Sequence, residues 1–515
     1  MNAPAGLARG RLGPADLGPA FREAFPAQRF IVVSNREPYE HTYGDGADRI
    51  QIRRPAGGLI SALDPLLQAV GGVWIAWGSG DADEEVVDER QRVRVPPEDP
   101  SYSLRRLWLD ERDLHHYYYG YSNQFLWPLC HLRPALTRIR SRYWERYQTV
   151  NRRFADAVLE EAAGDDVAVW FQDYHLALAP AAVRERRPEL TVAHFWHIPF
   201  PPLEIFRVAT NGAELLDGLL ANDLIGFHLP LFGDNFLRCA ESLVGAEVDW
   251  DRRLARYHGH TCNVRAFPIS IDVEAFADAA SGPAAAERVE RLRARYAPRG
   301  RLGIGVDRID YSKGLEEKLT ALDFLWDRHP EFRETFTYLQ VAVPSRTGIE
   351  AYDWLNEKLE RMVWSINDRY GTGEWRPIHM IKESLPWERL APMYRAADVC
   401  IVSSLQDGMN LVAKEYVACQ VDEPGGVLVL SKFAGAAEEL DGSVEVNPYD
   451  IEDFTARIRD ALLFGEDERR QRLRRLQGSL RTIYDWMAET FRVWGAAARG
   501  EIPPLSAADR WSRVR

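Results

Sequence analysis

The sequence predicts an α/β protein with parallel sheets, built as two Rossmann-like domains. Short apolar runs of strand length alternate with longer amphipathic patterns along most of the chain. This alternation favours parallel sheets whose strands are connected by helices. The predicted strands are 29–34, 167–171, 190–195, 224–228, 302–306, 337–343, 399–403 and 426–430, and two of the helices between them are predicted at 316–327 and 351–366.

A change in composition marks the expected boundary between the domains. The alanine-rich segment 279–286 follows an apolar segment, so we place the change near residues 268–290. Residues 1–28 are rich in Ala, Gly, Pro and Arg and lack the apolar core of a secretory signal, which predicts a flexible tail. The expected divisions are the tail at 1–28, an N-terminal Rossmann-like domain at 29–270, a C-terminal Rossmann-like domain at 271–475, and a final helix at 476–500.

Composition and charge narrow the class of function. The chain has 515 residues, of which 46% are hydrophobic and 27% charged, as in globular proteins with more than one domain. No apolar run of about 18 residues occurs, so no membrane span is expected. The net charge of −13 argues against a nucleic acid partner. Five cysteines without a CxxC pair favour buried free thiols in a reducing cytoplasm and give no spacing for a metal.

A basic turn at 305–314 is the strongest chemical signal. It follows a predicted strand, precedes a helical pattern, and contains Arg308 and Lys313. Two cations at the carboxyl end of a parallel strand, beside a helix N-terminus, suit a diphosphate. Neither can act as a general base there, so the turn indicates a transferase that uses an activated phosphate donor.

Residues 407–415 predict a second loop that faces a phosphate. Gly408 permits a tight turn, and the amides that open the following helix can face an anion. Asp407 can hold sugar hydroxyls, and Glu415 can accept both hydroxyls of a ribose. The alternative is an ordinary strand–loop–helix connection, with Asp407 as a cap and Glu415 in solvent.

Two pairs of residues carry weaker signals for phosphate binding. Gly57 and Gly58 open a helical pattern and offer their amides to a phosphate, although a plain turn is the simpler interpretation. Arg36 and Arg346 each follow a strand, in separate domains. Each is more often a surface residue, but together they could grip the phosphate of an acceptor.

Aromatic residues and two polar strand ends complete the candidate site. Tyr118 and Trp127 in the segment 117–128, and Trp77 after an apolar run, offer faces that can stack on a sugar. Asp173 and His197 follow two successive predicted strands. In a parallel sheet both would lie at the same edge, which favours a site over isolated core residues.

These segments, in this order, resemble the trehalose-6-phosphate synthase family of retaining glycosyltransferases over about residues 29–495. The resemblance implies a GT-B fold, in which two Rossmann-like domains face a cleft and a C-terminal helix, here 476–493, crosses back to the first domain. It implies transfer of glucose from UDP-glucose to glucose 6-phosphate with retention of configuration. The implied partners are these small molecules, without nucleic acid or membrane, in a cytoplasmic protein that can form a homo-oligomer.

The resemblance also implies roles for individual residues. The implied catalytic residues are Arg308, Lys313, His197, Asp407 and Asp173. The implied donor-binding residues are Gly57, Gly58, Arg308, Lys313, Leu385, Asp407, Gly408, Met409, Asn410, Leu411, Val412, Ala413, Lys414 and Glu415. The implied acceptor-binding residues are Arg36, Trp77, Tyr118, Trp127, Asp173 and Arg346.

The motifs favour a front-face mechanism without a metal or other cofactor. Retention by double displacement needs a nucleophile such as a paired carboxylate, which the motifs do not offer. Arg308 and Lys313 would instead stabilise the departing phosphate. Three positions depart from the family pattern, since Gln172 stands where His is usual, Gln406 where Arg is usual, and Pro55 before the glycine pair. The donor nucleotide therefore stays open between UDP, ADP and GDP.

Three alternatives remain. A related synthase that glucosylates glycerol 3-phosphate would lose the tyrosine-rich segment, which is intact here. A silent regulatory homologue would lose catalytic residues, yet Arg308, Lys313, Asp407 and Glu415 are present. A dinucleotide-dependent oxidoreductase would carry a GxGxxG fingerprint on the first strand, which the sequence lacks.

Overall fold

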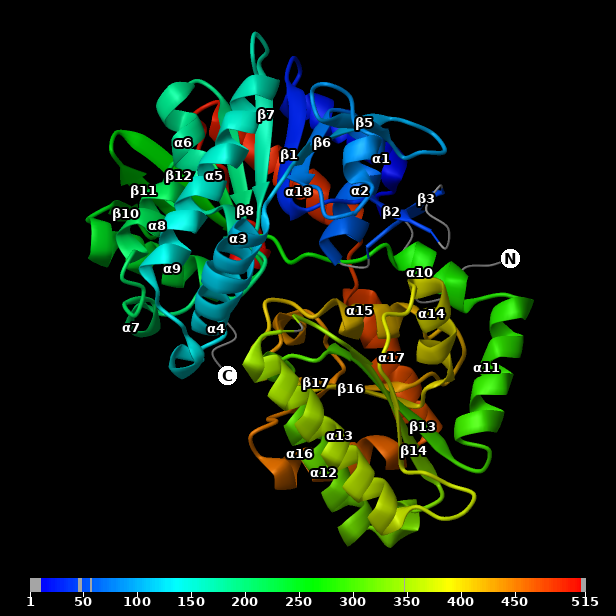
Figure 1. The fold of residues 1–515 in the computed structure, drawn as a ribbon. Coiled ribbons are helices and arrows are strands. Elements are labelled where there is room, and N and C mark those ends of the chain that lie inside the picture. The colour runs from blue at the N-terminus through cyan, green and yellow to red at the C-terminus, as the bar shows by residue number, and fades with distance from the viewer. Residues whose placement is uncertain (1–10, 45–48, 56–57, 347, 511–515) are drawn as a thin grey trace. The chain divides into compact units, whose positions relative to one another are not determined.

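The structure is a computed structural model that describes residues 11–44, 49–55, 58–346 and 348–510. The chain divides into two compact units (Figure 1). The N-terminal unit comprises residues 12–269 together with the C-terminal stretch from 484 onward. The C-terminal unit comprises 270–483, with Arg11. Each unit holds an α/β fold with parallel strands, which confirms the predicted fold class.

The described part of the N-terminal unit holds a ten-stranded sheet with the order β10-β11-β12-β9-β8-β7-β1-β4-β6-β5, and a separate hairpin of β2 and β3. The central strands from β12 to β6 are parallel, and the edge strands β5, β11 and β10 pair antiparallel. The strands are β1 (Arg29–Arg36), β2 (Glu40–Tyr43), β3 (Ile50–Arg53), β4 (Val73–Trp77), β5 (Arg92–Val95), β6 (Tyr102–Leu107), β7 (Val167–Gln172), β8 (Thr191–Phe195), β9 (Leu224–Phe227), β10 (Glu247–Asp249), β11 (Leu254–Tyr257) and β12 (His260–Ala266).

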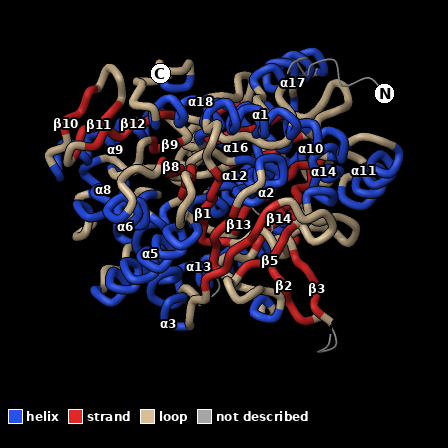
Figure 2. The backbone as a smooth tube through the Cα atoms, turned by 90° about the horizontal axis from the view of Figure 1, so that it is seen from above, coloured by secondary structure: helices blue, strands red, loops and turns tan. Residues whose placement is uncertain are grey.

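Helices of the N-terminal unit stand before, between and after these strands in the sequence (Figure 2). They are α1 (Pro14–Ala24), α2 (Gly58–Val70), α3 (Glu111–Asp113), α4 (Trp127–Cys130), α5 (Ser141–Glu161), α6 (Ala179–Arg186), α7 (Leu203–Phe206), α8 (Gly212–Leu220), α9 (Pro230–Val244) and α18 (Ile483–Ala498), with the π-helix η2 (Leu114–Leu126) and the short 3-10 turns η1 (Asp83–Glu85) and η4 (Tyr174–Leu176).

The C-terminal unit holds a six-stranded parallel sheet with the order β15-β14-β13-β16-β17-β18. Its strands are β13 (Arg301–Arg308), β14 (Phe336–Val343), β15 (Ile378–Ile381), β16 (Val399–Val402), β17 (Val427–Ser431) and β18 (Val444–Val446). Its helices are α10 (Val273–Ala280), α11 (Pro283–Tyr296), α12 (Leu315–Arg328), α13 (Glu350–Tyr370), α14 (Trp387–Ala396), α15 (Leu411–Ala418), α16 (Ile451–Leu463) and α17 (Glu466–Ser479), with the 3-10 turn η5 (Tyr311–Lys313).

The eight predicted strands are all present, with ends within two residues of the prediction. The structure explains why the sequence predicted these strands, since the central strands of both sheets are buried along nearly their whole length. A parallel strand covered on both faces reads as a continuous apolar run. The two predicted helices correspond to α12 and α13 and are also confirmed.

The flexible tail predicted for residues 1–28 is wrong from residue 11 onward, because α1 forms part of the core. Phe21 lies 5.3 Å from the ring of Phe491, and Phe25 lies 4.7 Å from Trp494, measured between ring centroids. Both partners are on α18, the red helix of Figure 1. The apolar residues of α1 recur at helical spacing, so burial of this face orders the segment.

The final helix predicted at 476–500 is wrong at its start. Helix α17 ends at Ser479, and Thr482 then makes a strand-like bridge with Ile271 before α18 begins at Ile483. From there the helix packs on the N-terminal unit. Trp486 stacks on Trp170 at 5.4 Å and donates its indole N–H to the carbonyl of Phe267 at 3.0 Å. The return of the chain to the first unit therefore begins at α18.

Each sheet reverses its strand order at one place that positions the predicted site residues. In the N-terminal unit β1 pairs with β4 on one side and with β7 on the other. In the C-terminal unit β13 pairs with β14 on one side and with β16 on the other. Ligands of open α/β sheets bind outside the carboxyl ends of the strands at such switch points. Arg36, Asp173, Arg308 and Asp407 all lie at or just after these ends.

Two further observations concern the whole described chain. All five cysteines are free and buried, as predicted. Among the described residues, no helix combines the length and apolar character needed to cross a membrane.

Candidate active site

The basic turn after β13 is built around a close approach of two loops. Arg308 ends β13 half-buried, η5 follows, and Gly314 adopts the left-handed conformation with φ of 61° before α12 begins. A Cβ atom on Gly314 would lie 2.0 Å from the carbonyl oxygen of Ser403. Only glycine therefore lets this turn pack against the loop that follows β16.

An ion pair joins the two loops of this switch point, which follow β13 and β16. Lys313 Nζ lies 2.6 Å from Asp407 Oδ2, and both side chains are nearly buried. The same carboxylate oxygen accepts hydrogen bonds from Ser404 Oγ at 3.0 Å and Asn410 Nδ2 at 3.2 Å. The backbone joins the loops as well, since Leu405 donates its N–H to the carbonyl of Ser312 at 2.7 Å. The structure thus brings together the two segments singled out in the sequence.

Residues 408–413 form a tight loop and the start of α15. Asn410 has a φ of 81°, and its Oδ1 caps the helix by accepting the N–H of Ala413 at 3.1 Å. The N–H groups of Leu411 and Val412 open the helix, where no helical carbonyl can accept them. Met409 and Gly408 pack through their backbones against the loop at Gly435. This segment can offer backbone amides to an anion.

The side chain of Lys414, which is also predicted to bind the donor, points into the interior behind the loop. It is buried and forms an ion pair with Glu439. An ammonium in this setting needs its carboxylate partner, because a buried unpaired charge is costly. Lys414 therefore stabilises the interior behind α15.

Two more of the predicted donor-binding residues, Glu415 and Leu385, lie in α15 and in the loop before α14. The phenol of Tyr394 donates a hydrogen bond to Glu415 Oε2 at 2.8 Å. Burial raises the pKa of Glu415 to about 7, and the bond from Tyr394 acts in the opposite direction. Glu415 is therefore partly buried and hydrogen-bonded rather than fully in solvent. Leu385 is buried between β15 and α14, in position to pack against an apolar group.

Arg346 is held by a carboxylate that the sequence reasoning missed. Its Nη1 lies 2.9 Å from Asp310 Oδ2, and it also donates to the phenol of Tyr352. Arg346 has a φ of 50°, an uncommon value for a residue with a side chain. Asp310 sits in the same turn as Arg308, so a carboxylate inside a basic turn was the signal available. The pairing with Asp310 and Tyr352 orients the guanidinium of Arg346.

In the N-terminal unit, two tyrosines of the π-helix η2 bind the end of β1. Tyr117 donates its hydroxyl to Asn35 Oδ1 at 2.8 Å. Arg36 donates from Nη2 to the Tyr118 hydroxyl at 2.9 Å. π-Helical turns are rare and are frequent at functional sites. This one aligns successive tyrosines with successive residues of the strand end.

A chain of aromatic rings runs through the same region. Tyr118 lies 6.0 Å from Trp77 and stacks on His175 at 5.8 Å. His175 stacks on Tyr174 at 4.0 Å, and Tyr174 lies 5.9 Å from Trp127. The structure therefore places all three aromatic residues predicted for the acceptor along one continuous series of rings.

Asp173 and His197 meet at neighbouring strand ends. The N–H of His197 donates to Asp173 Oδ1 at 3.1 Å, and its Nε2 lies 2.9 Å from Gln172 Oε1. Burial, with the imidazoles of His228 and His194 nearby, holds the pKa of His197 well below its usual value. Asp173 has φ 69° and ψ 172°, a region normally reserved for glycine. Strain of this kind, of order 1–3 kcal/mol, clusters at active sites.

A buried charged cluster lies directly behind Arg36. Arg106 binds Glu37 Oε2 through Nε at 2.7 Å and Asp83 Oδ1 through Nη2 at 2.8 Å. His41 completes the cluster at 2.8 Å from Arg106. Burial, followed by the neighbouring Asp83, raises the pKa of Glu37 to about 8. The pKa of Asp83 is lowered instead, because hydrogen bonds from His41 and Glu37 outweigh the effect of burial. Glu37 also accepts the N–H of Ser79 at 2.7 Å, so the cluster joins the end of β1 to the loop after β4.

The glycine pair is described in part. Gly58 is the exposed first residue of α2. Gly57 lies outside the described residues.

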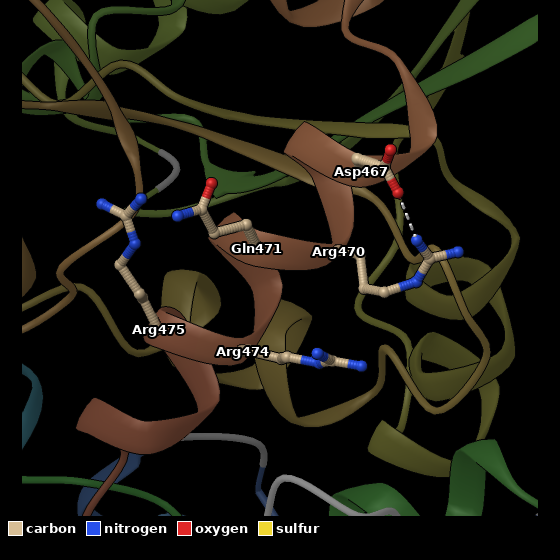
Figure 3. Close-up of a pocket in the computed structure, with 5 residues that line it drawn as sticks. All are labelled: Asp467, Arg470, Gln471, Arg474 and Arg475. Atoms are coloured by element: carbon tan, nitrogen blue, oxygen red, sulfur yellow. Dashed lines mark hydrogen bonds and ion pairs between the residues drawn. The ribbon is translucent and has the colours of Figure 1, made fainter.

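Surface arginines on α17 line a cavity that is not part of this site. It has a volume of about 520 Å³ and is lined by Asp467, Arg470, Gln471, Arg474 and Arg475 (Figure 3). Arg470 is paired with Asp467 at 2.8 Å and Glu423 at 2.9 Å, and Arg474 with Glu423 at 3.2 Å. Carboxylates therefore offset the charges of Arg470 and Arg474, and no predicted site residue lines the cavity.

No group of three or more His, Cys, Asp or Glu side chains suited to hold a metal occurs within the described ranges. The polar groups at the two switch points are instead cations, hydroxyls, amides and single carboxylates. Two Rossmann-like units with this chemistry, and a C-terminal helix that returns to the first unit, define a nucleotide-sugar glycosyltransferase with a GT-B fold.

Comparison with known proteins gives the family. The chain belongs to glycosyltransferase family 20, whose model matches residues 28–494. It is 38% identical over 501 residues to a trehalose-6-phosphate synthase of Mycolicibacterium smegmatis, covering 94% of this chain and 97% of that protein.

Solved structures agree with the sequence match. A UDP-forming α,α-trehalose-phosphate synthase of Burkholderia xenovorans, in complex with glucose-6-phosphate, superposes with a TM-score of 0.80 at 32% identity, covering 90% of this chain and 99% of that one. A structure from E. coli bound with UDP-2-fluoro glucose gives a TM-score of 0.78 at 31% identity, covering 94% and 100%. The expected family and fold are thereby confirmed.

Proposed function

We propose that this chain is an α,α-trehalose-6-phosphate synthase that transfers glucose from UDP-glucose to the anomeric hydroxyl of glucose 6-phosphate. The named relatives support both substrates. The observation that carries the proposal is the Lys313–Asp407 pair, which joins a diphosphate-binding cation to a sugar-binding carboxylate at one switch point. We assign donor binding to residues 271–475 and acceptor binding to residues 29–270.

The proposed mechanism is a front-face displacement with retention. The bond from the anomeric carbon to the diphosphate breaks, and the new bond to the acceptor oxygen forms on the same face. The acceptor hydroxyl gives its proton to the departing phosphate oxygen. Arg308 and Lys313 stabilise the negative charge on that phosphate, which is electrostatic catalysis without a metal or other cofactor.

The remaining residues orient the two substrates. Asp407 and His197 hold hydroxyls of the donor glucose, Glu415 holds the ribose, and Leu385 packs on the base. The amides at 408–412, with those of Gly57 and Gly58, address the diphosphate. Arg36, Tyr118 and Arg346 bind the acceptor phosphate, while Asp173, Trp127 and Trp77 surround the acceptor sugar.

A matrix of donors and acceptors tests the function. UDP-, ADP- and GDP-glucose are each combined with glucose 6-phosphate, glucose and glycerol 3-phosphate, and the product is identified by NMR. We expect an α,α-linked disaccharide phosphate and release of the nucleoside diphosphate. Tight binding without release would favour a regulatory protein, and turnover with glycerol 3-phosphate alone would favour the related synthase. The same protein in size-exclusion chromatography with light scattering reports the oligomeric state, and fractionation tests the proposed cytoplasmic location.

Tyr118→Phe is expected to raise the KM for glucose 6-phosphate by roughly 2- to 10-fold with little change in kcat. The substitution removes the hydroxyl that accepts from Arg36, and a hydrogen bond of this kind contributes about 0.5–1.5 kcal/mol. Tyr119→Phe is the matched control, because it removes a neighbouring hydroxyl from the same helix. An equal rise in the donor KM would contradict a role at the acceptor.

The kcat/KM for the donor should depend on the ionisation of Glu415. Since burial raises the pKa of Glu415 to about 7, the carboxylate that accepts ribose hydroxyls is lost as the pH falls below 7. We expect kcat/KM to fall from pH 8 to pH 6 with an inflection near 7 that Glu415→Gln removes. Tyr394→Phe should move this inflection to higher pH, because the lost hydrogen bond favours the charged form. An unchanged profile in Glu415→Gln would refute the assignment.

A further inference from the structure

Gln172 and His197 are held together across two parallel strands. Gln172 ends β7 and is fully buried, and its Cα partner on β8 is Phe195, two residues before His197. Its Oε1 lies 2.9 Å from the Nε2 atom of His197. The backbone N–H of His197 donates to the next residue of the same strand end, Asp173. Both the ring and the backbone of His197 are therefore fixed by the end of β7.

The chemistry of an amide oxygen decides which ring nitrogen carries the proton. An amide oxygen accepts hydrogen bonds and has no proton to give, so the nitrogen that faces it must be protonated. In a neutral imidazole the other nitrogen is then an acceptor. We propose that Gln172 is a positioning residue that holds His197 in the Nε2–H form, so that Nδ1 accepts a hydrogen bond from a hydroxyl of the transferred sugar. The sugar's identity rests on the proposed glucosyl transfer.

The groups around His197 keep the ring neutral. The charged or titratable groups that face it are the carboxylate of Asp173 and the imidazoles of His194 and His228, while α18 contributes the indole of Trp486. Burial and the two imidazoles hold the pKa of His197 far below its usual value. Gln172 adds an acceptor to this environment without adding a charge.

Other side chains at position 172 would not do this. A carboxylate would accept the same bond but would favour the cationic ring, which has no acceptor nitrogen. An imidazole can serve as donor or acceptor and would impose no single tautomer. The Nε2 amide group of Gln172 has no hydrogen-bond partner among the described residues. A buried N–H group without an acceptor is unfavourable, so packing alone does not explain a glutamine here. The Oε1 atom of Gln172, which contacts His197, is the part of the amide that has a role.

The tautomer can be observed directly. We would label the histidines of the full-length protein with ¹⁵N, record two-bond ¹H–¹⁵N correlation spectra, and assign the His197 ring from the signal lost in His197→Ala. We expect wild-type His197 to be protonated at Nε2 throughout pH 6–8. A ring protonated at Nδ1 would overturn the proposal, because the amide must then be turned around.

Three substitutions separate positioning from packing. Gln172→Met keeps the length of the side chain without its hydrogen bond and should lower kcat/KM for the donor by up to about 100-fold at every pH. Gln172→Glu should raise the pKa of His197, so that its activity relative to wild type falls as the pH decreases. Gln172→His should show a mixture of tautomers. Gln420→Met is the matched control, because Gln420 is also buried and its side-chain amide bonds to the backbone of Tyr394 and Gly426.

The outcomes distinguish a positioning role of Gln172 from a structural one, and both from a failure of the proposed function. The control should change thermal stability without changing the His197 spectrum. If Gln172→Met keeps wild-type activity, or if all variants lose activity in parallel with stability and with no change in the pH dependence, Gln172 is structural and the positioning role is refuted. If the wild type transfers no glucose in the substrate matrix, the proposed function fails instead, and the spectra still report the tautomer.

Discussion

Replacing Arg308 by alanine is expected to lower kcat by about 10²- to 10³-fold, equivalent to roughly 2.7–4 kcal/mol of lost transition-state stabilisation. Arg308 ends β13 at the switch point of the C-terminal unit. In the proposed reaction, negative charge grows on the diphosphate as the glycosidic bond breaks. A guanidinium beside it then acts more strongly in the transition state than on the bound donor, so kcat should fall by more than the donor KM rises.

Controls distinguish lost chemistry from lost structure. Arg328→Ala removes an exposed arginine of the same unit, paired with Glu452 on the surface, and should leave kcat unchanged. Added guanidinium should restore part of the activity of Arg308→Ala. Lys313→Ala is a less clean probe, because it leaves Asp407 without its cation, and the double variant Lys313→Ala/Asp407→Asn measures their coupling. Wild-type turnover in Arg308→Ala would disprove the assignment of Arg308 to the leaving group.

Arg106→Ala is expected to destabilise the N-terminal unit by about 3–5 kcal/mol, since it leaves two buried carboxyl groups without their cation. The apparent Tm of that unit should fall by on the order of 10 °C in calorimetry. Arg94→Ala, which removes an exposed arginine of β5, is the control and should change stability by no more than about 0.5 kcal/mol.

The pH dependence of this defect has a defined sign. Without Arg106 the folded-state pKa of Glu37 and of Asp83 should lie above the unfolded values, so the folded state binds protons more tightly. Stability is then retained at low pH and lost as the pH rises through the folded pKa values. The deficit should be smaller at pH 5 than at pH 8. A deficit independent of pH would mean that lost packing, not unpaired charge, causes the instability.

The sequence predicted the helices and strands whose hydrophobic pattern is uninterrupted. Buried parallel strands such as β7 and β13 are continuous apolar runs, whereas β5 and β6 each carry two arginines, which interrupt the apolar pattern, and were not predicted. In and just after α1, Gly and Pro in the composition obscured the spacing of Leu17, Phe21 and Phe25. Phe21 and Phe25 pack on Phe491 and Trp494, which lie far away in the sequence. No local pattern contains that information.

The candidate site was also predicted only in part. Motifs predicted which segments meet, because parallel strands bring their carboxyl ends to one edge. They did not predict partners supplied by tertiary structure, such as Tyr394 for Glu415 and Asp310 for Arg346. Nor did they predict that the side chain of Lys414 pairs with Glu439 in the interior.

The position of α18 has a consequence for biosynthesis. Phe491 and Trp494 complete the aromatic core around Phe21, Phe25 and Trp170, yet they are made long after these partners. The N-terminal unit therefore cannot close before α18 is made, while residues 270–483 precede most of α18 and are already available to fold. We expect the nascent chain to show the reverse of the usual N-to-C folding order, with the N-terminal unit dependent on chaperones until α18 arrives.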